Sequence, residues 1–257
     1  MIYDLLKAYR ADGRRVLANE TANTYYKRLC KLFEGQSITD TVNCLDMVKI
    51  LDNLKLIKHK NYFSQTKNAF LHFCKFQNIV LSSDIIKSIE EIEKCTSRKY
   101  KKLVPVEYKE VDTTIKHIRN IKLKLSYQTI IATGLRVFEL SQITPTDCNV
   151  TDDTITFCFT AKGGKTETVI ISKSEYSKLF QRLTEHIKST STDKKLFYSA
   201  VYLQKQAKKL GFGCHDLRRT YAKLEYKKCG SKEEVKEKLR HSNMKNTNIY
   251  LNSKIKL

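Results

Sequence analysis

The sequence predicts a mainly α-helical protein with one small β-hairpin, an α+β fold arranged as two helical domains. Apolar residues recur at helical spacing over most of the 257 residues, whereas strict alternation of apolar and polar residues is limited to positions 154–171. With only 2 Pro and 8 Gly, the chain has few helix breakers. Hydrophobic residues make up 41% of the sequence, which is enough for sizeable cores, and the length fits one or two domains.

Residues 1–95 are predicted to form a helical domain of four or five helices. The helices are expected at residues 22–34, 41–57, 62–77 and 84–94, where apolar side chains recur every three or four positions. Thr21 is a suitable N-cap for the first of them.

Residues 96–104 are predicted to be a basic linker, and residues 105–257 a second domain. The linker has no acidic residue and no helical periodicity, so it could follow a phosphate backbone. Its candidate DNA contacts are Arg98, Lys99, Lys101 and Lys102.

The second domain is predicted to contain helices around a hairpin. Residues 106–132 are helical in pattern, and residues 154–160 and 166–171 alternate as strands on either side of a Gly-rich turn. Helices follow the hairpin. Gly230 is expected to end one of them, Ser231 to cap the next, and a last helix to follow Asn243.

The charge balance favours a nucleic acid as partner. The chain has a net charge of +21, divided between residues 1–104 (+8) and residues 105–257 (+13). Both halves therefore suit a polyanion, as expected of a protein that wraps its nucleic-acid partner. A Lys-rich composition inherited from an AT-rich genome would also produce this excess. No apolar run reaches the ~18 residues of a membrane span, and no signal peptide is visible. We therefore expect a soluble intracellular protein, in the cytoplasm or nucleoid, or in the host cell if the protein is viral.

The 8 cysteines do not form a metal-binding pattern. None lies in a Cys-x-x-Cys pair, and no His is spaced to complete a zinc site. We expect most of them to be small buried hydrophobic residues in a reducing compartment. The sequence also lacks a phosphate-binding Gly loop, so no cofactor and no metal are expected.

Four segments of residues 105–257 carry candidate chemistry. They are Thr133-Gly134-Leu135-Arg136-Val137-Phe138-Glu139-Leu140, the hairpin turn with Lys162 and Lys165, His215-Asp216-Leu217-Arg218-Arg219, and the stretch from Leu239 through His241 to Tyr250. Each has an ordinary interpretation on its own: a surface Arg in a helical turn, solvated lysines, or one of 14 tyrosines.

Taken together, these segments resemble the tyrosine recombinase/phage integrase family. The resemblance rests on the order Arg, Lys, His-x-x-Arg, His and Tyr, with 26 residues from Arg136 to Lys162 and nine from His241 to Tyr250. It covers most of residues 105–257. The first domain is similar to the family's core-binding (SAM-like) domain, by position and helix content only.

The resemblance implies a role for each matching residue. Tyr250 would attack a DNA phosphate and form a 3′-phosphotyrosyl link, and Arg136, Arg218 and His241 would bind the non-bridging oxygens. Lys162 would protonate the departing 5′ oxygen, with Lys165 as the alternative, and His215 would assist proton transfer. Glu139 would support the pocket, and Arg219 and Arg240 would add contacts to DNA. The implied partner is double-stranded DNA, bound by a C-shaped clamp that is a monomer or weak dimer when free and a tetramer, two protomers per site, on DNA.

The sequence departs from the family's pattern at two places. Arg240 precedes His241, where the family usually has Gly, and it could add a phosphate contact or change a turn. Only Leu251–Leu257 follow Tyr250, so the tail is expected to be short, and whether Tyr250 acts in cis or in trans stays open. The chain resembles a minimal two-domain recombinase.

Other functions remain open at this stage. A type IB topoisomerase uses similar chemistry, and a DNA-binding protein that has lost catalysis is a third interpretation. Among biological roles, the composition favours integration or excision of a mobile element over resolution of chromosome dimers. The target sequence cannot be read from the chain, because base recognition depends on which side chains reach the groove edges.

Overall fold

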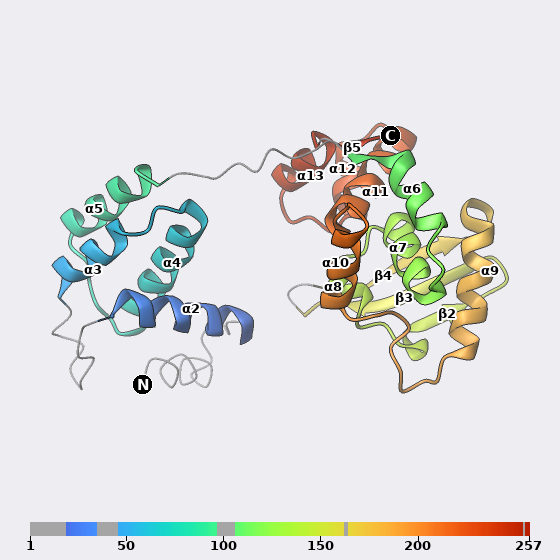
Figure 1. Ribbon diagram of the computed structural model, residues 1–257, viewed down its shortest axis with the longest axis horizontal. Helices are drawn as coiled ribbons and strands as arrows, with labels where there is room; N and C mark the ends of the chain where they lie inside the picture. The colour runs from blue at the N-terminus through green and yellow to red at the C-terminus, as the bar shows by residue number, and fades with distance from the viewer. Residues whose placement is uncertain (1–18, 35–45, 97–105, 162–163, 254) are drawn as a thin grey trace. The chain divides into compact units, whose positions relative to one another are not determined.

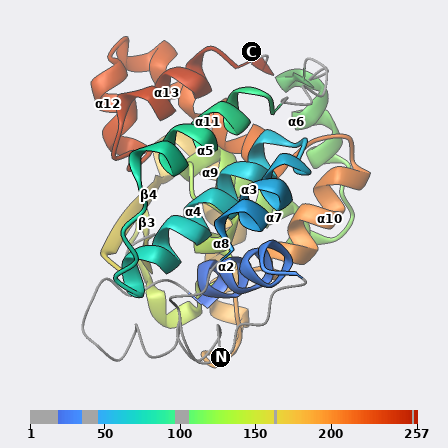
Figure 2. The same cartoon turned by 90° about the vertical axis from the view of Figure 1, so that its left-hand side faces the viewer.

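The computed structural model describes residues 19–34, 46–96, 106–161, 164–253 and 255–257. The chain divides into two compact units, residues 1–102 and residues 103–257 (Figures 1 and 2). Each unit has a hydrophobic core of its own. As predicted, the fold is mainly helical with a small antiparallel sheet.

The first unit is a small helical bundle. Its helices are α2 (Asn19–Leu32), α3 (Met47–Lys55), α4 (Lys60–Phe76) and α5 (Ser83–Lys94). Each overlaps a segment that the apolar spacing predicts; residues 41–45 of the second predicted helix lie outside the described residues. Asp46 and Ser82 cap α3 and α5, accepting hydrogen bonds from the backbone N–H of Lys49 and Ile85. The core gathers one apolar face from each helix around Phe63 and Phe70, which are fully buried.

The second unit packs helices against one face of a three-stranded sheet, whose other face is exposed. Its helices are α6 (Tyr108–Lys116), α7 (Ile121–Thr133), α8 (Val137–Leu140), α9 (Lys173–Ser189), α10 (Ala200–Lys209), α11 (Cys214–Cys229), α12 (Lys232–Lys238) and α13 (Met244–Leu251). The antiparallel strands, in sheet order, are β2 (Cys148–Val150), β3 (Thr154–Thr160) and β4 (Thr166–Ser172). β3 and β4 are the predicted hairpin, paired over seven residues from Thr154–Ser172 to Thr160–Thr166.

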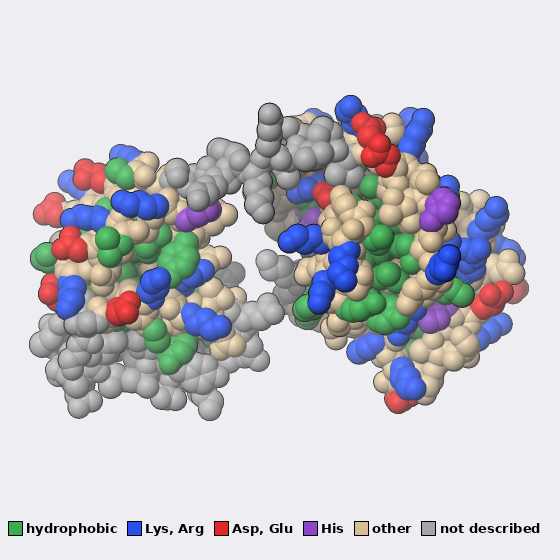
Figure 3. Space-filling view, in the orientation of Figure 1, with side chains coloured by type: hydrophobic (Ala, Val, Ile, Leu, Met, Phe, Trp, Pro, Cys, Tyr) green, Lys and Arg blue, Asp and Glu red, His purple; other side chains and the backbone are tan. Residues whose placement is uncertain are grey.

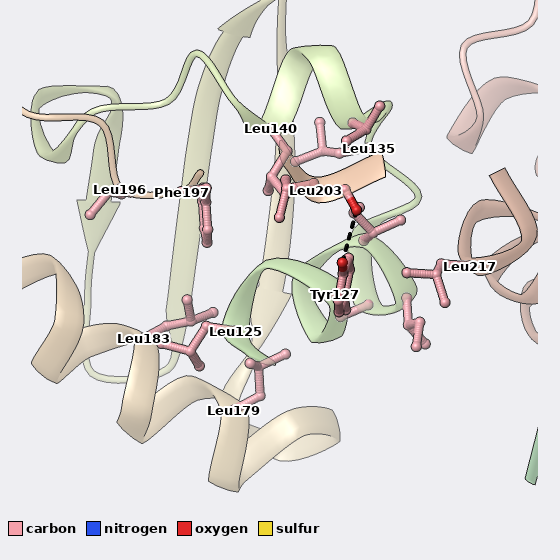
Figure 4. Packing of buried hydrophobic residues seen from close by; sticks show 14 of the residues in the cluster. Leu125, Tyr127, Leu135, Leu140, Leu179, Leu183, Leu196, Phe197, Leu203 and Leu217 are labelled. Atoms are coloured by element: carbon pink, nitrogen blue, oxygen red, sulfur yellow. Dashed lines mark hydrogen bonds between the residues drawn. The ribbon is translucent and has the colours of Figure 1, made fainter. Parts of the chain in front are cut away.

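Helix α7 lies at the centre of this unit. Nine of its 13 residues are buried, so the helix is apolar on nearly all sides and packs against α9 and α11. The Tyr127 hydroxyl donates to the backbone carbonyl of Leu203 in α10 at 2.9 Å, so the one polar atom of this ring is satisfied inside the core (Figure 4). A rigid central helix fixes the position of the turn that follows it at Gly134.

Several local expectations are wrong. Residues 106–132 do not form one helix: a break at residues 117–120 separates α6 from α7, because the Asn120 side chain caps α7 by accepting from the Leu123 N–H at 2.9 Å. The periodicity also does not predict the short strand β2. Nor does it predict the parallel pair of β1 (Val106–Glu107) and β5 (Ile255–Lys256), which brings the segment after α13 against the start of the unit.

The cysteine expectation holds only in part. Cys74 and Cys214 are buried, and burial raises the pKa of Cys74 to about 12 and that of Cys214 to about 11, so both are unreactive thiols at neutral pH. Cys30, Cys95 and Cys158 are exposed instead. Among the described residues, no helix combines the length and apolar character that a bilayer crossing requires.

Candidate functional site

Arg136 is held at the start of α8 by a carboxylate three residues later. The backbone N–H of Arg136 donates to Glu139 Oε2 at 2.8 Å, and its Nη1 donates to Oε1 at 2.7 Å. Glu139 is only 3% exposed, so its charge needs these partners. The Arg136 side chain, 27% exposed, is therefore oriented by a buried ion pair while part of it remains accessible.

The turn between α7 and α8 requires glycine. Gly134 ends α7 in the left-handed conformation, with φ at +63°. A Cβ at this position would lie 2.4 Å from Cδ1 of Tyr221, so the tyrosine ring of α11 packs directly against the Gly134 backbone. This close approach brings the Gly134 carbonyl within reach of α11.

Arg218 on α11 is buried and forms hydrogen bonds with two turns, one after α7 and one after α12. It is 1% exposed, and it donates to the carbonyl of Gly134 through Nη1 and to that of Leu239 through Nη2. Burial, followed by the proximity of Arg136, lowers the pKa of Arg218 to about 10. The guanidinium remains charged at neutral pH, so a fixed positive charge lies beneath the site.

His241 and Tyr250 face each other across the turn between α12 and α13. Their rings pack edge to face at 4.9 Å between centroids, and His241 Nδ1 lies 3.0 Å from the Thr247 hydroxyl. Burial and the nearby charges of Arg218 and Arg136 lower the pKa of His241 to about 4. His241 is thus neutral at pH 7, and its ring position is fixed by Thr247 and Tyr250.

The Tyr250 hydroxyl also reaches the first turn of α11. It lies 3.4 Å from Nδ1 of His215, and the Arg219 guanidinium stands 5.7 Å from the Tyr250 ring centroid. Arg219 in turn pairs with Asp216 at 2.7 Å. Desolvation, then Arg219 and Arg218, lower the pKa of His215, so the neutral imidazole beside the phenol is favoured.

Of the predicted lysines and linker cations, the structure describes Lys165, which is exposed at the tip of the β3–β4 hairpin. The others lie outside the described residues: Lys162, Arg98, Lys99, Lys101 and Lys102. The hairpin turn closes through hydrogen bonds from Ala161 N–H to the Lys165 carbonyl and from Gly164 N–H to the Ala161 carbonyl.

The structure brings seven predicted residues together from three segments. Arg136 and Glu139 come from the α7–α8 turn, His215, Arg218 and Arg219 from α11, and His241 and Tyr250 from the α12–α13 region. Arg240 joins them through a 3.5 Å contact with Glu139. Thr247 and Tyr221 are supporting residues that sequence reasoning missed, since a buried Thr and a Tyr packed on glycine leave no local signal.

The chemistry of this arrangement is that of an anion site beside a nucleophile. Arg136 and Arg240 both contact the Glu139 carboxylate, and the buried charge of Arg218 lies close to them, so positive charges outnumber negative ones around Glu139. Lys and Arg side chains are also spread over the surface of this unit (Figure 3). Within the described ranges, no group of His, Cys, Asp and Glu has the arrangement of a metal site. Fixed guanidinium donors next to a phenol can stabilise charge that develops on a phosphate.

Comparison with known proteins places the chain in a family. Residues 105–256 match the phage integrase family. No curated protein sequence matches the chain significantly.

Solved structures share the fold over both units at low sequence identity. The XerH site-specific recombinase, bound to difH substrate in a pre-cleavage complex, has a TM-score of 0.67 at 18% identity, covering 97% of this chain and 90% of that one. The Tn1549 transposon integrase with circular intermediate DNA has a TM-score of 0.65 at 15% identity, over 98% and 95%. A lambda integrase dimer bound to a COC′ core site has a TM-score of 0.62 at 14% identity, over 97% and 95%.

Proposed function

The chain belongs to the phage integrase family of tyrosine site-specific recombinases, and we propose that it cuts and rejoins DNA through a 3′-phosphotyrosyl intermediate during integration or excision of a mobile element. The observation that carries the proposal is the placement of Tyr250, whose hydroxyl lies 3.4 Å from His215 and whose ring packs against His241, close to the charges of Arg136 and Arg218. A nucleophile, a neutral base and fixed cations are the groups that phosphoryl transfer to a tyrosine needs.

In the cleavage step, the Tyr250 oxygen attacks the scissile phosphorus, and the bond from phosphorus to the 5′ oxygen breaks. A phenol is a weak nucleophile while it keeps its proton, so the proton must be removed during the attack. His215 Nδ1 accepts this proton. Lys162 donates a proton to the departing 5′ oxygen, so a 5′-hydroxyl end leaves and the 3′ phosphate stays on Tyr250.

Charge stabilisation belongs to the other side chains of the pocket. The pentacoordinate transition state carries more negative charge on the non-bridging oxygens than the phosphodiester does. Arg136 and Arg218 neutralise that charge from fixed positions, and neutral His241 donates a hydrogen bond through the ring nitrogen that does not face Thr247. Because the phosphotyrosyl ester retains the energy of the phosphodiester, rejoining is the reverse reaction and needs no ATP.

Double-stranded DNA is the proposed partner, held by both units. The solved relatives are bound to DNA, and the two parts of this chain carry net charges of +8 and +13. One protomer supplies one Tyr250 and cuts one strand, so exchange between two duplexes requires four protomers, two per site.

Sedimentation with and without DNA tests the assembly. We expect a monomer or weak dimer in free solution, a tetramer when two sites are joined, and affinity that falls steeply with salt as counterions are released. A stable tetramer without DNA would contradict the assembly while leaving the chemistry intact.

The catalytic proposal is tested on a nicked suicide duplex that carries a sequence selected by binding from a random library. The wild-type chain should form a covalent protein–DNA adduct. Tyr250→Phe should form none while binding the duplex with nearly unchanged affinity, since only the nucleophilic oxygen is lost and many phosphate contacts remain. Tyr226→Phe, a half-exposed tyrosine on α11, is the matched control and should behave as wild type.

Three outcomes would redirect the proposal. An adduct formed by Tyr250→Phe would place the nucleophile elsewhere. A wild-type chain that binds the selected duplex without ever forming an adduct would be a DNA-binding protein. Relaxation of plasmids that lack the selected sequence, without strand exchange between two copies of it, would identify a type IB topoisomerase.

A further inference from the structure

Arg240 occupies a backbone position that favours glycine. It follows α12 with φ at +55°, in the left-handed region that non-glycine residues rarely adopt. Its two neighbours both belong to the site: the Leu239 carbonyl accepts from Arg218, and His241 packs against Tyr250. A strained residue kept at this position needs a compensating interaction of its side chain.

The Arg240 side chain makes such interactions inside the pocket. It is 12% exposed, Nη1 donates to the Lys238 carbonyl at 3.2 Å, and Nη2 lies 3.5 Å from Glu139 Oε2. Its guanidinium carbon stands 5.0 Å from the ring centroid of Phe159 on β3, close enough for a cation–π interaction. The side chain therefore runs from the α12–α13 turn towards the α7–α8 turn instead of into solvent.

The carboxylate that Arg240 contacts, that of Glu139, also binds Arg136. Glu139 Oε1 accepts from Nη1 of Arg136, whereas Oε2 accepts from the Arg136 backbone N–H and faces Arg240. Two cations on one buried carboxylate fix the rotation of the carboxylate plane. That rotation determines where the Arg136 guanidinium points.

We propose that Arg240 is a positioning residue for Arg136 and acts through Glu139. The inference rests on the proposed function, in which Arg136 stabilises the reacting phosphate. While Arg136 donates hydrogen bonds to that phosphate, Arg240 remains paired with the buried Glu139 carboxylate and holds it in position. Small errors in the position of a catalytic group cost large factors in rate, so this support should appear in the chemical step and not in DNA binding.

Arg240→Gly is the decisive variant, because it removes the whole Arg240 side chain, guanidinium included, while glycine accepts the left-handed backbone. We expect thermal stability close to that of wild type, because relief of the left-handed backbone strain offsets the lost contact with Glu139. DNA affinity should be unchanged, and single-turnover cleavage at saturating DNA should be slower by ~10-fold or more. Arg240→Lys should recover part of the rate, because lysine again places a positive charge beside Glu139 but lacks the planar guanidinium group. Arg119→Gly removes the same charge from an exposed loop and is the matched control, expected to cleave at the wild-type rate.

A double-mutant cycle with Glu139→Gln identifies the route of the effect. If Arg240 acts through Glu139, the double variant should cleave no more slowly than the slower single variant. The proposal would be overturned if the rate losses of the two single variants multiply in the double variant and a neutral methylphosphonate at the scissile position restores cleavage by Arg240→Gly. Those results would show that Arg240 contacts the phosphate directly. Cleavage by Arg240→Gly at the wild-type rate would also overturn it and leave Arg240 a turn residue.

Failure of the proposed function has a different signature, since the wild-type chain would then form no adduct. The link between the two residues is still measurable in that case, because Arg240→Gly and Glu139→Gln should be non-additive in the free energy of unfolding. Additive effects there would exclude the contact with Glu139 on which the positioning role depends.

Discussion

The Tyr250 hydroxyl on α13 lies 3.4 Å from Nδ1 of His215 on α11. The contact joins the proposed nucleophile to a base that is 35 residues away in the sequence. Desolvation and the neighbouring Arg219 and Arg218 lower the pKa of His215 below 6.5, so the free enzyme holds an imidazole that can accept the phenolic proton at neutral pH.

The first prediction concerns this pair. His215→Gln should lower the rate of adduct formation by at least ~10²-fold, the scale of lost general base catalysis. In wild type the rate should fall as pH decreases through the pKa of His215, because protonated imidazole cannot accept the proton. Rates measured from neutral pH downwards should show this acid limb in wild type and lose it in His215→Gln. The exposed His117→Asn is the control, and an unchanged acid limb in His215→Gln would assign the base to another group.

The two arginines proposed to stabilise charge on the phosphate, the partly exposed Arg136 and the buried Arg218, should each contribute strongly to the rate. Arg136→Ala and Arg218→Ala are expected to cleave at least ~10²-fold more slowly, as when a preorganised transition-state donor is removed. Lysine at either position should recover little, since a point charge does not reproduce the guanidinium fork. Cleavage near the wild-type rate by either alanine variant would show that the pocket is misplaced.

Stability measurements separate chemistry from folding in these variants. Arg218→Ala leaves the carbonyls of Gly134 and Leu239 without their donor, so it should also lower the free energy of unfolding by about 1–3 kcal/mol. Rates are therefore compared at a temperature where circular dichroism shows each variant folded. Arg182→Ala, on the exposed side of α9, controls for the loss of one positive charge.

Leaving-group chemistry distinguishes the two hairpin lysines. If Lys162 is the general acid, Lys162→Ala should cleave an ordinary duplex slowly and be rescued by a bridging 5′-sulfur, which departs without a proton. Lys165→Ala should behave as a binding variant that the sulfur does not rescue. Rescue of Lys165→Ala alone would exchange the two roles. The measurement is the ratio of sulfur to oxygen cleavage rates for each variant.

Much of the fold and part of the site follow from local patterns. Helices α2, α4 and α5 and the β3–β4 hairpin follow the period of their apolar residues, and Ser231 caps α12 as its sequence predicts, accepting from the Glu234 N–H at 3.2 Å. The break before α7 depends on a single capping side chain, Asn120, within an otherwise helical pattern. Periodicity is insensitive to such a cap, which explains the error over residues 106–132.

The residues of the candidate site could be predicted only from the order and spacing of their motifs along the sequence. Spacing in the sequence cannot show that Arg218 is buried under two turns, or that Arg240 reaches Glu139 across 101 residues, because both depend on how α11 and α12 pack. Arg240 was expected to add a DNA contact, whereas its guanidinium is mostly enclosed. Its partners became visible only with the tertiary structure.

The lowered pKa of His241 predicts a pH dependence of stability. In the folded chain the pKa is about 4, whereas an unfolded histidine has a value near 6.5. Between these values the unfolded state binds a proton that the folded state does not, so stability is complete above about pH 6.5 and decreases as pH falls towards 4. The loss from this residue is at most about 3 kcal/mol.

Urea unfolding at about pH 8 and about pH 5 measures this contribution. His241→Gln cannot titrate, so it should lose less stability between the two values than wild type does. Histidines that remain in both proteins, such as His72 and His215, cancel in the comparison. Equal losses in the two proteins would mean that His241 is protonated as easily in the folded chain as in the unfolded one.

The last prediction concerns Gly134, which combines two constraints on one residue. Its φ of +63° disfavours any side chain, and a Cβ would lie 2.4 Å from Tyr221 Cδ1. Gly230 has φ at +69°, but a Cβ there would have no atom within 4 Å, so it carries the backbone constraint alone. Gly230→Ala should therefore lower the free energy of unfolding by about 1–2 kcal/mol, and Gly134→Ala by about 2–4 kcal/mol, because displacing the tyrosine ring adds to the backbone cost.

The two glycine variants should also differ in activity. Gly134→Ala shifts the carbonyl that Arg218 holds and the turn that carries Arg136, so its cleavage should slow, whereas Gly230→Ala should cleave normally once folded. Tyr221→Leu removes the ring from the site of the clash, so adding it to Gly134→Ala should restore part of the lost stability relative to the sum of the single variants. Chemical unfolding and adduct formation by all four proteins test this. Equal destabilisation by the two alanine substitutions would show that the Tyr221 ring moves aside freely and does not fix the Arg136 turn.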